Sequence, residues 1–222
     1  MDKGLKKKIL ITATKLFFSL GYEKSSIRKI EKESGINYGS IMHALGYKEN
    51  LVCEIVTYIL DKQAKVIEEE IDSKTSDPVK KYITEKVLQL YMAECNEELR
   101  EMYNVAYSME RSSNIIHITL TKKLEKVFKE KLPNYDTIDF YCLELSSAGI
   151  VRSYLARKCD MFFTMKVKVD KFIENFLKMY DYNDKEIKEI KEFVYLFDLK
   201  GLAKNTVSKM PAYIEKRISE EK

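Results

Sequence analysis

Side chains that could bind a nucleic acid lie close together in one stretch of the sequence, IEKESGINYGSIMHAL, residues 30–45. Two glycines occur in it, with a tyrosine between them and a histidine after the second. Donors, acceptors and flat apolar groups of this kind suit contacts to base edges and phosphates. The candidate contact residues are Asn37, Tyr38, Ser40, Met42 and His43.

Residues that would indicate an enzyme or a metal site are scarce. The chain has two histidines, His43 and His117, and four cysteines that lie far apart and form no C-x-x-C pair. It contains no G-x-S-x-G or H-E-x-x-H motif and no glycine-rich phosphate loop. We therefore predict no catalytic residue, no metal site and no cofactor, and an all-helical enzyme is the disfavoured alternative.

Short helices would position the candidate contacts. Apolar residues recur every three or four positions over residues 5–20 and a glycine follows them, which predicts an amphipathic helix with a glycine stop. Ser25 or Ser26 can cap a second helix that must end near Gly35, and Asn37 can cap a third.

Three short helices with a tight glycine turn between the second and the third are the layout of a helix-turn-helix, whose last helix lies in the major groove of DNA. Gly35 can take the positive φ of the turn, and Gly39 lets the backbone approach a neighbour such as a phosphate. Ile30, Ile41 and Leu45 can fix the two helices over the first one. The alternative is a helical corner that binds nothing.

Charge is distributed unevenly along the chain. Residues 1–50 carry ten Lys or Arg and five Asp or Glu, a net charge of +5, whereas the other 172 residues carry 29 basic and 30 acidic side chains, a net charge of −1. A basic segment is where a polyanion would be held. Because lysine is abundant throughout the chain, a solvated lysine-rich face is the alternative.

The run from Ile9 to Ile55 resembles the N-terminal domain of the TetR family of bacterial transcriptional regulators. The resemblance rests on LFFSLG at the end of the first helix, a serine pair before the second, GINYGSI across the turn and KENL at the start of a long fourth helix. It implies DNA contacts from Ser26 and Arg28 on the second helix, from Tyr38, Gly39, Ser40, Met42 and His43 on the third, and from Lys48, to a phosphate, at the start of the fourth.

Five positions depart from the usual family pattern. Family members have Ala in place of Glu31 and Ser34. They have Tyr in place of Met42, Phe in place of Leu45 and a small polar cap in place of Tyr47. We expect Glu31 to need water or a cation at a packed corner, and Tyr47 to leave its helix without a side-chain cap. We also expect an unusual operator preference. The five residues are Glu31, Ser34, Met42, Leu45 and Tyr47.

Few turn-forming residues interrupt the rest of the chain. With 7 Gly and 3 Pro in 222 residues, the composition predicts long helices and an all-α protein. We expect nine to eleven helices, including those over 48–71, 137–157 and 164–180, with a short last segment after Pro211. The predicted domains are a helix-turn-helix domain at 1–50, with its motif at about 26–45, and a helical ligand-binding and dimerisation domain at 51–222.

Small residues in the helix over 137–157 could let two helices approach closely, as a subunit interface requires. A twofold dimer would place its two helix-turn-helix domains about 34 Å apart, which is one turn of DNA. The family resemblance also implies a homodimer through this helix and the helix over 164–180, and ordinary packing within the chain is the alternative. The predicted interface residues are Ser146, Ser147, Gly149, Ile150, Tyr154, Phe172 and Phe176.

The middle of the chain is rich in Tyr and Met, which could line an adaptable apolar ligand pocket or simply form the core. Four carboxylates lie on or near these faces, Glu94, Glu98, Glu101 and Glu144, so a lipophilic cation is one ligand class to consider. His117 is expected to be a satisfied core histidine. The predicted ligand-binding residues are Tyr91, Cys95, Met102, Tyr103, Tyr107 and Tyr141.

With the family resemblance, these patterns predict a regulator that binds double-stranded operator DNA as a homodimer and acts as a repressor released by a small, largely apolar inducer. The alternative is an inducer-independent helix-turn-helix regulator, or a DNA-organising protein, controlled by a protein partner. No signal-peptide pattern and no run of about 18 uncharged apolar residues occurs, so we expect a cytoplasmic protein without a membrane partner. Its four cysteines are expected to be reduced core thiols.

Overall fold

The structure is a computed structural model that describes residues 3–220, including all side chains there except those of residues 110–116. The described residues form eleven helices and no strand, which confirms the all-α prediction. In chain order the helices are α1 (Lys3–Leu20), α2 (Ile27–Ser34), α3 (Tyr38–Leu45), α4 (Lys48–Ile71), α5 (Pro78–Cys95), α6 (Glu97–Ser108), α7 (Glu110–Phe128), α8 (Thr137–Ala156), α9 (Met165–Lys178), α10 (Asp184–Val194) and α11 (Leu199–Glu220).

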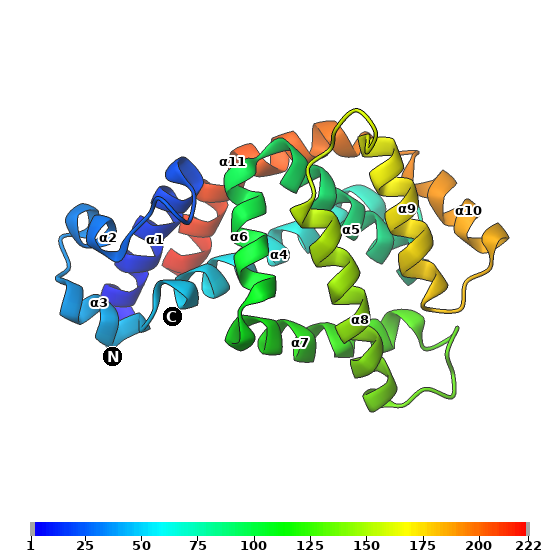
Figure 1. Cartoon of the computed structure of the whole chain (residues 1–222), viewed down its shortest axis with the longest axis horizontal. Coiled ribbons are helices and arrows are strands. Elements are labelled where there is room, and N and C mark those ends of the chain that lie inside the picture. Colours follow the sequence, from blue (N-terminus) through cyan, green and yellow to red (C-terminus); the bar gives the residue numbers. More distant parts are fainter. Residues whose placement is uncertain (1–2, 221–222) are drawn as a thin grey trace.

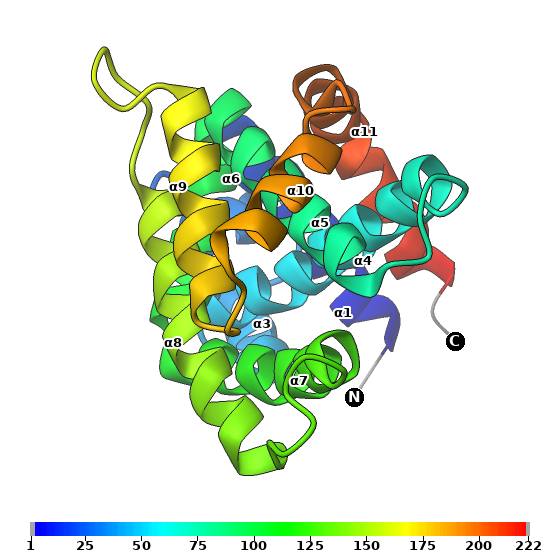
Figure 2. The same ribbon diagram turned by 90° about the vertical axis from the view of Figure 1, so that its right-hand side faces the viewer.

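The molecule is elongated, with α1, α2 and α3 at one end of its long axis and α10 at the other (Figure 1). Helix α11 contacts α1, α4 and α5, so the last helix of the chain runs back towards the first. Helices α8 and α9 pack against each other, and the turned view shows them side by side along one edge of the molecule (Figure 2).

Helix α1 has the amphipathic character that its spacing predicted. Ile9, Ala13 and Phe17 are fully buried and belong to a continuous apolar core that extends from α1 to α11. Gly21 follows the helix with a φ of +83°, a left-handed conformation that glycine adopts without a steric penalty. The sequence prediction of a glycine stop is therefore confirmed.

Helix α4 begins and ends at the predicted residues, Lys48 and Ile71. Its buried side, which includes Leu51, Ile55 and Ile59, belongs to the same core. Because α4 contacts α1 and α3 as well as α5, α6 and α11, it connects the N-terminal helices with the remainder of the molecule.

The prediction of a short separate segment after Pro211 is wrong, because α11 continues through this proline from Leu199 to Glu220. A proline inside a helix removes one backbone hydrogen bond and costs about 3 kcal/mol. Met210, Ile214 and Ile218 form a buried stripe on both sides of the proline. The burial of this stripe can offset the cost of the proline and keep the helix in one piece.

The cysteines are less buried than the sequence suggested. Cys95 and Cys142 are exposed, and Cys53 and Cys159 are only partly buried, so the expectation of core thiols is wrong for the first two at least. Cys142 lies on the outer side of α8, and Cys95 is the last residue of α5. Within residues 3–220, none of the helices is both long enough and apolar enough to cross a lipid bilayer.

Candidate nucleic-acid interface

Helices α2 and α3 and the turn between them, residues 27–45, form a compact unit that we call the α2–α3 unit. Ser26 caps α2, because its hydroxyl oxygen accepts a hydrogen bond from the Lys29 N–H at 3.2 Å. Gly35 ends α2 with a φ of +68°, and its N–H donates to the Glu31 carbonyl at 2.8 Å. The predicted cap and the predicted positive φ are both confirmed.

Asn37 starts α3 as predicted, since its Oδ1 accepts a hydrogen bond from the Ser40 N–H at 2.9 Å. On the inner side of α3, Ile41 and Leu45 are buried and pack with Ile30 of α2 in the core. On the outer side, Tyr38 has 48% of its surface exposed. The helix is thus fixed from one side and open on the other.

Glu31 has an internal hydrogen bond that the sequence did not predict. Its Oε1 accepts from the backbone N–H of Tyr38, the first residue of α3, at 2.8 Å. Ser34 is buried, and its Oγ accepts from the Ile36 N–H at 3.2 Å. The expectation that Glu31 needs water or a cation is therefore wrong. Both departures from the family pattern supply hydrogen bonds inside the α2–α3 unit.

The residues predicted to contact DNA differ in exposure. Arg28, Tyr38, Gly39 and His43 are exposed. A Cβ atom added to Gly39 would meet only the Asn37 Oδ1, at 3.4 Å, so the chain itself has room for a side chain there. Of the other predicted contacts, Ser26 and Asn37 are also exposed but use their side-chain oxygens as helix caps, and Ser40, Met42 and Lys48 are partly buried.

Lys48 has contacts within the chain. Its Nζ donates to the Tyr22 carbonyl at 2.8 Å and lies 3.7 Å from the centre of the Tyr22 ring. Burial lowers the pKa of Lys48, and nearby carboxylates such as Glu49 oppose this effect. Lys48 therefore connects the start of α4 to the loop between α1 and α2, and its contact with a DNA phosphate stays a prediction.

The start of α4 lacks a side-chain cap, as predicted for Tyr47. The turn before it is secured instead by Asn50, whose Nδ2 donates to the Leu45 carbonyl at 2.6 Å. Gly46 has a φ of +69°, which explains why a glycine occurs between α3 and α4. The position of α3 relative to α4 is therefore fixed by this turn.

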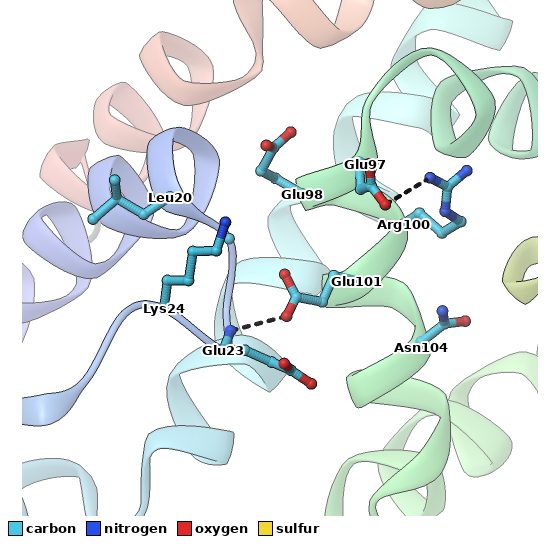
Figure 3. Close-up of a pocket in the computed structure, with 9 residues that line it drawn as sticks. Leu20, Glu23, Lys24, Glu97, Glu98, Arg100, Glu101 and Asn104 are labelled. Carbon is cyan, nitrogen blue, oxygen red and sulfur yellow. Dashed lines mark hydrogen bonds and ion pairs between the residues drawn. The ribbon is translucent and has the colours of Figure 1, made fainter.

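The loop between α1 and α2 is joined to α6 through one carboxylate. Glu101 Oε2 accepts from the Tyr22 N–H at 3.0 Å, and Oε1 accepts from the Glu23 N–H at 2.9 Å. The second of these bonds is drawn in Figure 3, beside an open pocket of about 420 Å³ between the loop and α6. A Cβ atom on Gly21 would lie 2.5 Å from Glu101 Oε2, so the glycine also makes room for this contact.

The sequence had suggested Glu101 only as a possible partner of a cationic ligand. Its two hydrogen bonds go to backbone groups 78 and 79 residues away in sequence, and no spacing pattern connects positions so far apart. Tyr22 also donates through its hydroxyl to Glu49 Oε1 at 3.1 Å. Tyr22 therefore links three elements, the α1–α2 loop, α4 and α6.

The residues predicted to bind a ligand do not form a single group. Met102, Tyr103 and Tyr107 of α6 are buried, as an internal site requires. Cys95 and Tyr141 are exposed and do not lie in the interior with these three, so their part in ligand binding stays a prediction. The periodicity of a helix does not tell which face is covered, and Tyr141 lies on the outer face of α8. Tyr91 is partly buried.

The predicted interface residues are also divided by the fold. Ser147, Phe172 and Phe176 are buried within the chain, so their assignment to a surface of contact with a second copy is wrong. The two phenylalanines of α9 pack against each other, with ring centres 5.6 Å apart, in the protein's own core. Of the others, Ser146 and Gly149 are exposed, and Ile150 and Tyr154 are partly buried.

Large apolar residues that the sequence did not single out are exposed on α8. Ile138 has 72% of its surface exposed and Leu145 has 45%, and Tyr141 lies between them at helical spacing. Their spacing of three and four residues was the available signal, because it places them together on one face of α8, out of phase with the buried Phe140, Glu144 and Ser147.

Comparison with known proteins gives one informative similarity. The chain is similar to a Bacillus subtilis (strain 168) protein named "Uncharacterized HTH-type transcriptional regulator YxaF", with 40% identity over 75 residues. The match covers 33% of this chain and 39% of that protein, so it spans about two fifths of the relative's length. No protein-family model and no solved structure matches the chain. This similarity supports a DNA-binding regulator.

Proposed function

We propose that this protein is a transcriptional regulator of the TetR type that binds operator DNA through α3. The observation that carries the proposal is the α2–α3 unit: internal hydrogen bonds fix it on one side, and Tyr38 and His43 are exposed on the other, within a segment of net charge +5. The similarity to a protein named as a helix-turn-helix regulator supports the same function. We place its DNA-binding domain at 1–50 and its regulatory domain at 51–222.

Fluorescence anisotropy with DNA from upstream of the protein's own gene tests this function. Because phosphate contacts release counterions, the logarithm of the affinity should fall linearly with the logarithm of the salt concentration. Arg28→Ala should weaken binding to all sequences alike, whereas Tyr38→Ala or His43→Ala should change the sequence preference. Binding without a salt slope would exclude the proposal.

The proposed functional form is a homodimer. Ile138, Tyr141 and Leu145 form an exposed apolar face on α8, and α9 lies beside this helix (Figure 2). A second copy that covered this face would remove it from water and pair two α3 helices for two half-sites about 34 Å apart.

A repressor that is released by a ligand needs a connection between the ligand and α3, and α6 offers one. Met102 and Tyr103 of α6 face the core, while the neighbouring Glu101 holds the Tyr22 and Glu23 amides of the α1–α2 loop. A ligand that displaced α6 would therefore move the loop and, through Lys48 and Tyr22, the start of α4. Such a ligand shifts the equilibrium only if it binds one arrangement better than the other.

A further inference from the structure

Two exposed apolar patches lie at opposite ends of α8. The first, which we call the α8 face, consists of Ile138, Tyr141 and Leu145 near the start of the helix. The second, which we call the loop tip, consists of Met161 and Phe162 in the loop between α8 and α9, with 82% and 83% of their surfaces exposed. These two are the most exposed large apolar residues in the described part of the chain, so the loop tip is a candidate contact surface.

The loop tip is held in place by hydrogen bonds. Asp160 Oδ1 accepts from the Phe162 N–H at 2.9 Å, which closes a tight turn. At the base of the loop, the Glu94 carboxylate of α5 accepts from the Cys159 N–H at 3.0 Å and from the buried Lys168 Nζ at 3.0 Å. Because the loop is ordered in advance, little conformational entropy would be lost when another surface covers its tip.

The direction of α8 restricts how two copies can pair. Helix α8 runs across the long axis of the molecule, and the α2–α3 unit lies at one end of that axis (Figure 1). A dimer that reads two half-sites needs both α2–α3 units on one side, so its twofold axis must run along the long axis. Rotation by 180° about such an axis makes the two α8 helices antiparallel. The start of α8 in one copy then lies beside the α8–α9 loop of the other.

The loop is placed where this arrangement needs it. In the view along the long axis, the loop projects from the edge of the molecule that α8 and α9 form (Figure 2). Between the two patches, the exposed side of α8 carries the small residues Gly149, Ser153 and Ala156, and a Cβ atom added to Gly149 would meet nothing within 4 Å. Arg152 is also exposed there and can extend its guanidinium to the edge of the contact. Two helices can therefore approach each other closely at the middle of α8.

The charges at the two ends of α8 are complementary. Residues 134–143, around the α8 face, carry two acidic and no basic side chains, whereas residues 157–166, around the loop tip, carry three basic and one acidic. Antiparallel pairing brings the negative end of each copy to the positive end of the other. The outer side of α9 carries three exposed lysines, Lys166, Lys171 and Lys178, so two α9 helices placed face to face would repel each other.

We propose that the loop tip of one copy docks on the α8 face of a second copy, so that the dimer contains two identical contacts of Met161 and Phe162 with Ile138, Tyr141 and Leu145. The inference rests on the proposed homodimer and specifies how its copies pair. Each contact removes apolar surface from water and brings the Phe162 ring to the Tyr141 ring. Because the two contacts lie on either side of the twofold axis, they fix the rotation of one copy against the other and thereby the spacing of the two α3 helices.

Charged variants at the two patches test the pairing. Leu145→Arg and Phe162→Asp should each be monomeric in sedimentation velocity, because both contacts of either homodimer would bury an unpaired charge. An equimolar mixture of the two should form a heterodimer, since the new arginine faces the new aspartate in one contact and the other contact is wild type. Phe162→Arg is the matched control, because its mixture with Leu145→Arg places two arginines together and should stay monomeric. Both positions are exposed, and the heterodimer itself would show that both variants fold.

Disulfide formation locates the contact. Cys142 follows Tyr141 on the exposed side of α8. Phe162→Cys should therefore form an intermolecular disulfide with Cys142 of the partner subunit under mild oxidation, a bond that needs Cα atoms within about 7 Å. Peptide mass spectrometry should identify the link, and adding Cys142→Ser should remove it. The wild type should form no link between its two Cys142 residues, because antiparallel pairing holds them at opposite ends of the contact.

The outcomes separate the pairing from the proposed function. A dimer of Phe162→Asp alone, a mixture that stays monomeric, or a link between two Cys142 residues in the wild type would overturn the pairing and leave the homodimer in place. A wild-type protein that is monomeric even on operator DNA would refute the homodimer and the pairing together. Absence of operator binding by a dimer with the expected disulfide would refute only the DNA-binding function.

Discussion

The Glu31 carboxylate accepts a hydrogen bond from the Tyr38 backbone N–H at 2.8 Å and thereby joins α2 to the first residue of α3. At the start of a helix, a negatively charged acceptor satisfies an unpaired N–H and interacts favourably with the helix dipole. The residue that departs from the family pattern thus helps to set the angle between the two helices of the α2–α3 unit.

We expect Glu31→Ala to destabilise the protein by about 1 kcal/mol, as the loss of a helix cap does. Urea unfolding followed by circular dichroism would measure the change. Glu33→Ala is the matched control, because Glu33 is exposed on the same helix and carries the same charge. Both variants lose one negative charge, which favours DNA binding in both. Weaker operator binding by the Glu31 variant than by the Glu33 variant would therefore report an altered angle between α2 and α3. Equal stability and affinity in the two variants would refute a capping role.

The two hydrogen bonds from Glu101 to the α1–α2 loop lead to a second prediction. In Glu101→Ala the amides of Tyr22 and Glu23 should exchange with deuterium about tenfold faster or more, since both lose their acceptor. Operator binding should weaken as the loop loosens. Glu98→Ala, at the same pocket, removes an equal charge without these two bonds and should leave the exchange of both amides unchanged. Unaltered exchange in the Glu101 variant would show that α6 does not hold the loop.

Local features of the fold could be predicted from the sequence because they depend on residues close together in the chain. The caps Ser26 and Asn37 and the turn at Gly35 are each determined within a few residues, and the bounds of α4 follow from its apolar repeat. The same locality explains the error at Pro211. A rule about one residue predicted a break, whereas packing along the whole of α11 keeps the helix continuous.

Contacts between distant residues could not be predicted in this way. The sequence predicts helices over 137–157 and 164–180, but it does not say which of their apolar residues face the chain's own core. For that reason Phe172 was assigned to an interface although it is buried, and Ile138 was overlooked although it is exposed. The bond between Glu101 and Tyr22 joins residues 79 positions apart and has no local signal at all.

The exposed apolar face of α8 predicts how the protein assembles. We expect Leu145→Arg to convert a dimer into a monomer, because the dimer would bury an unpaired charge at its interface. Operator binding should also weaken, because a single α2–α3 unit contacts only one half-site. Sedimentation velocity would measure the mass. Leu196→Arg is the control, since Leu196 is exposed in the turn after α10 and is not part of α8. Dimers in both variants would exclude this face as the interface.

The buried Glu144 should make the stability depend on pH. Burial raises its pKa to about 7 from 4.5, and the nearby Lys86 opposes the rise. Since the folded protein keeps this proton at pH values where the unfolded chain has lost it, the contribution of Glu144 to the free energy of unfolding should fall as the pH rises from about 4.5 to 7. The total loss should be about 3 kcal/mol.

Glu144→Gln removes this titration and keeps the shape of the side chain. The difference in stability between the variant and the wild type should therefore grow in favour of the variant between pH 5 and pH 8, as measured by urea unfolding at both pH values. His117 contributes with the opposite sign, since burial lowers its pKa and its protonation destabilises the fold as the pH falls. Comparing the Glu144→Gln variant with the wild type at each pH largely cancels the His117 contribution, because both proteins contain it. A difference that stays constant from pH 5 to pH 8 would mean that Glu144 ionises in the folded protein as readily as in the unfolded chain.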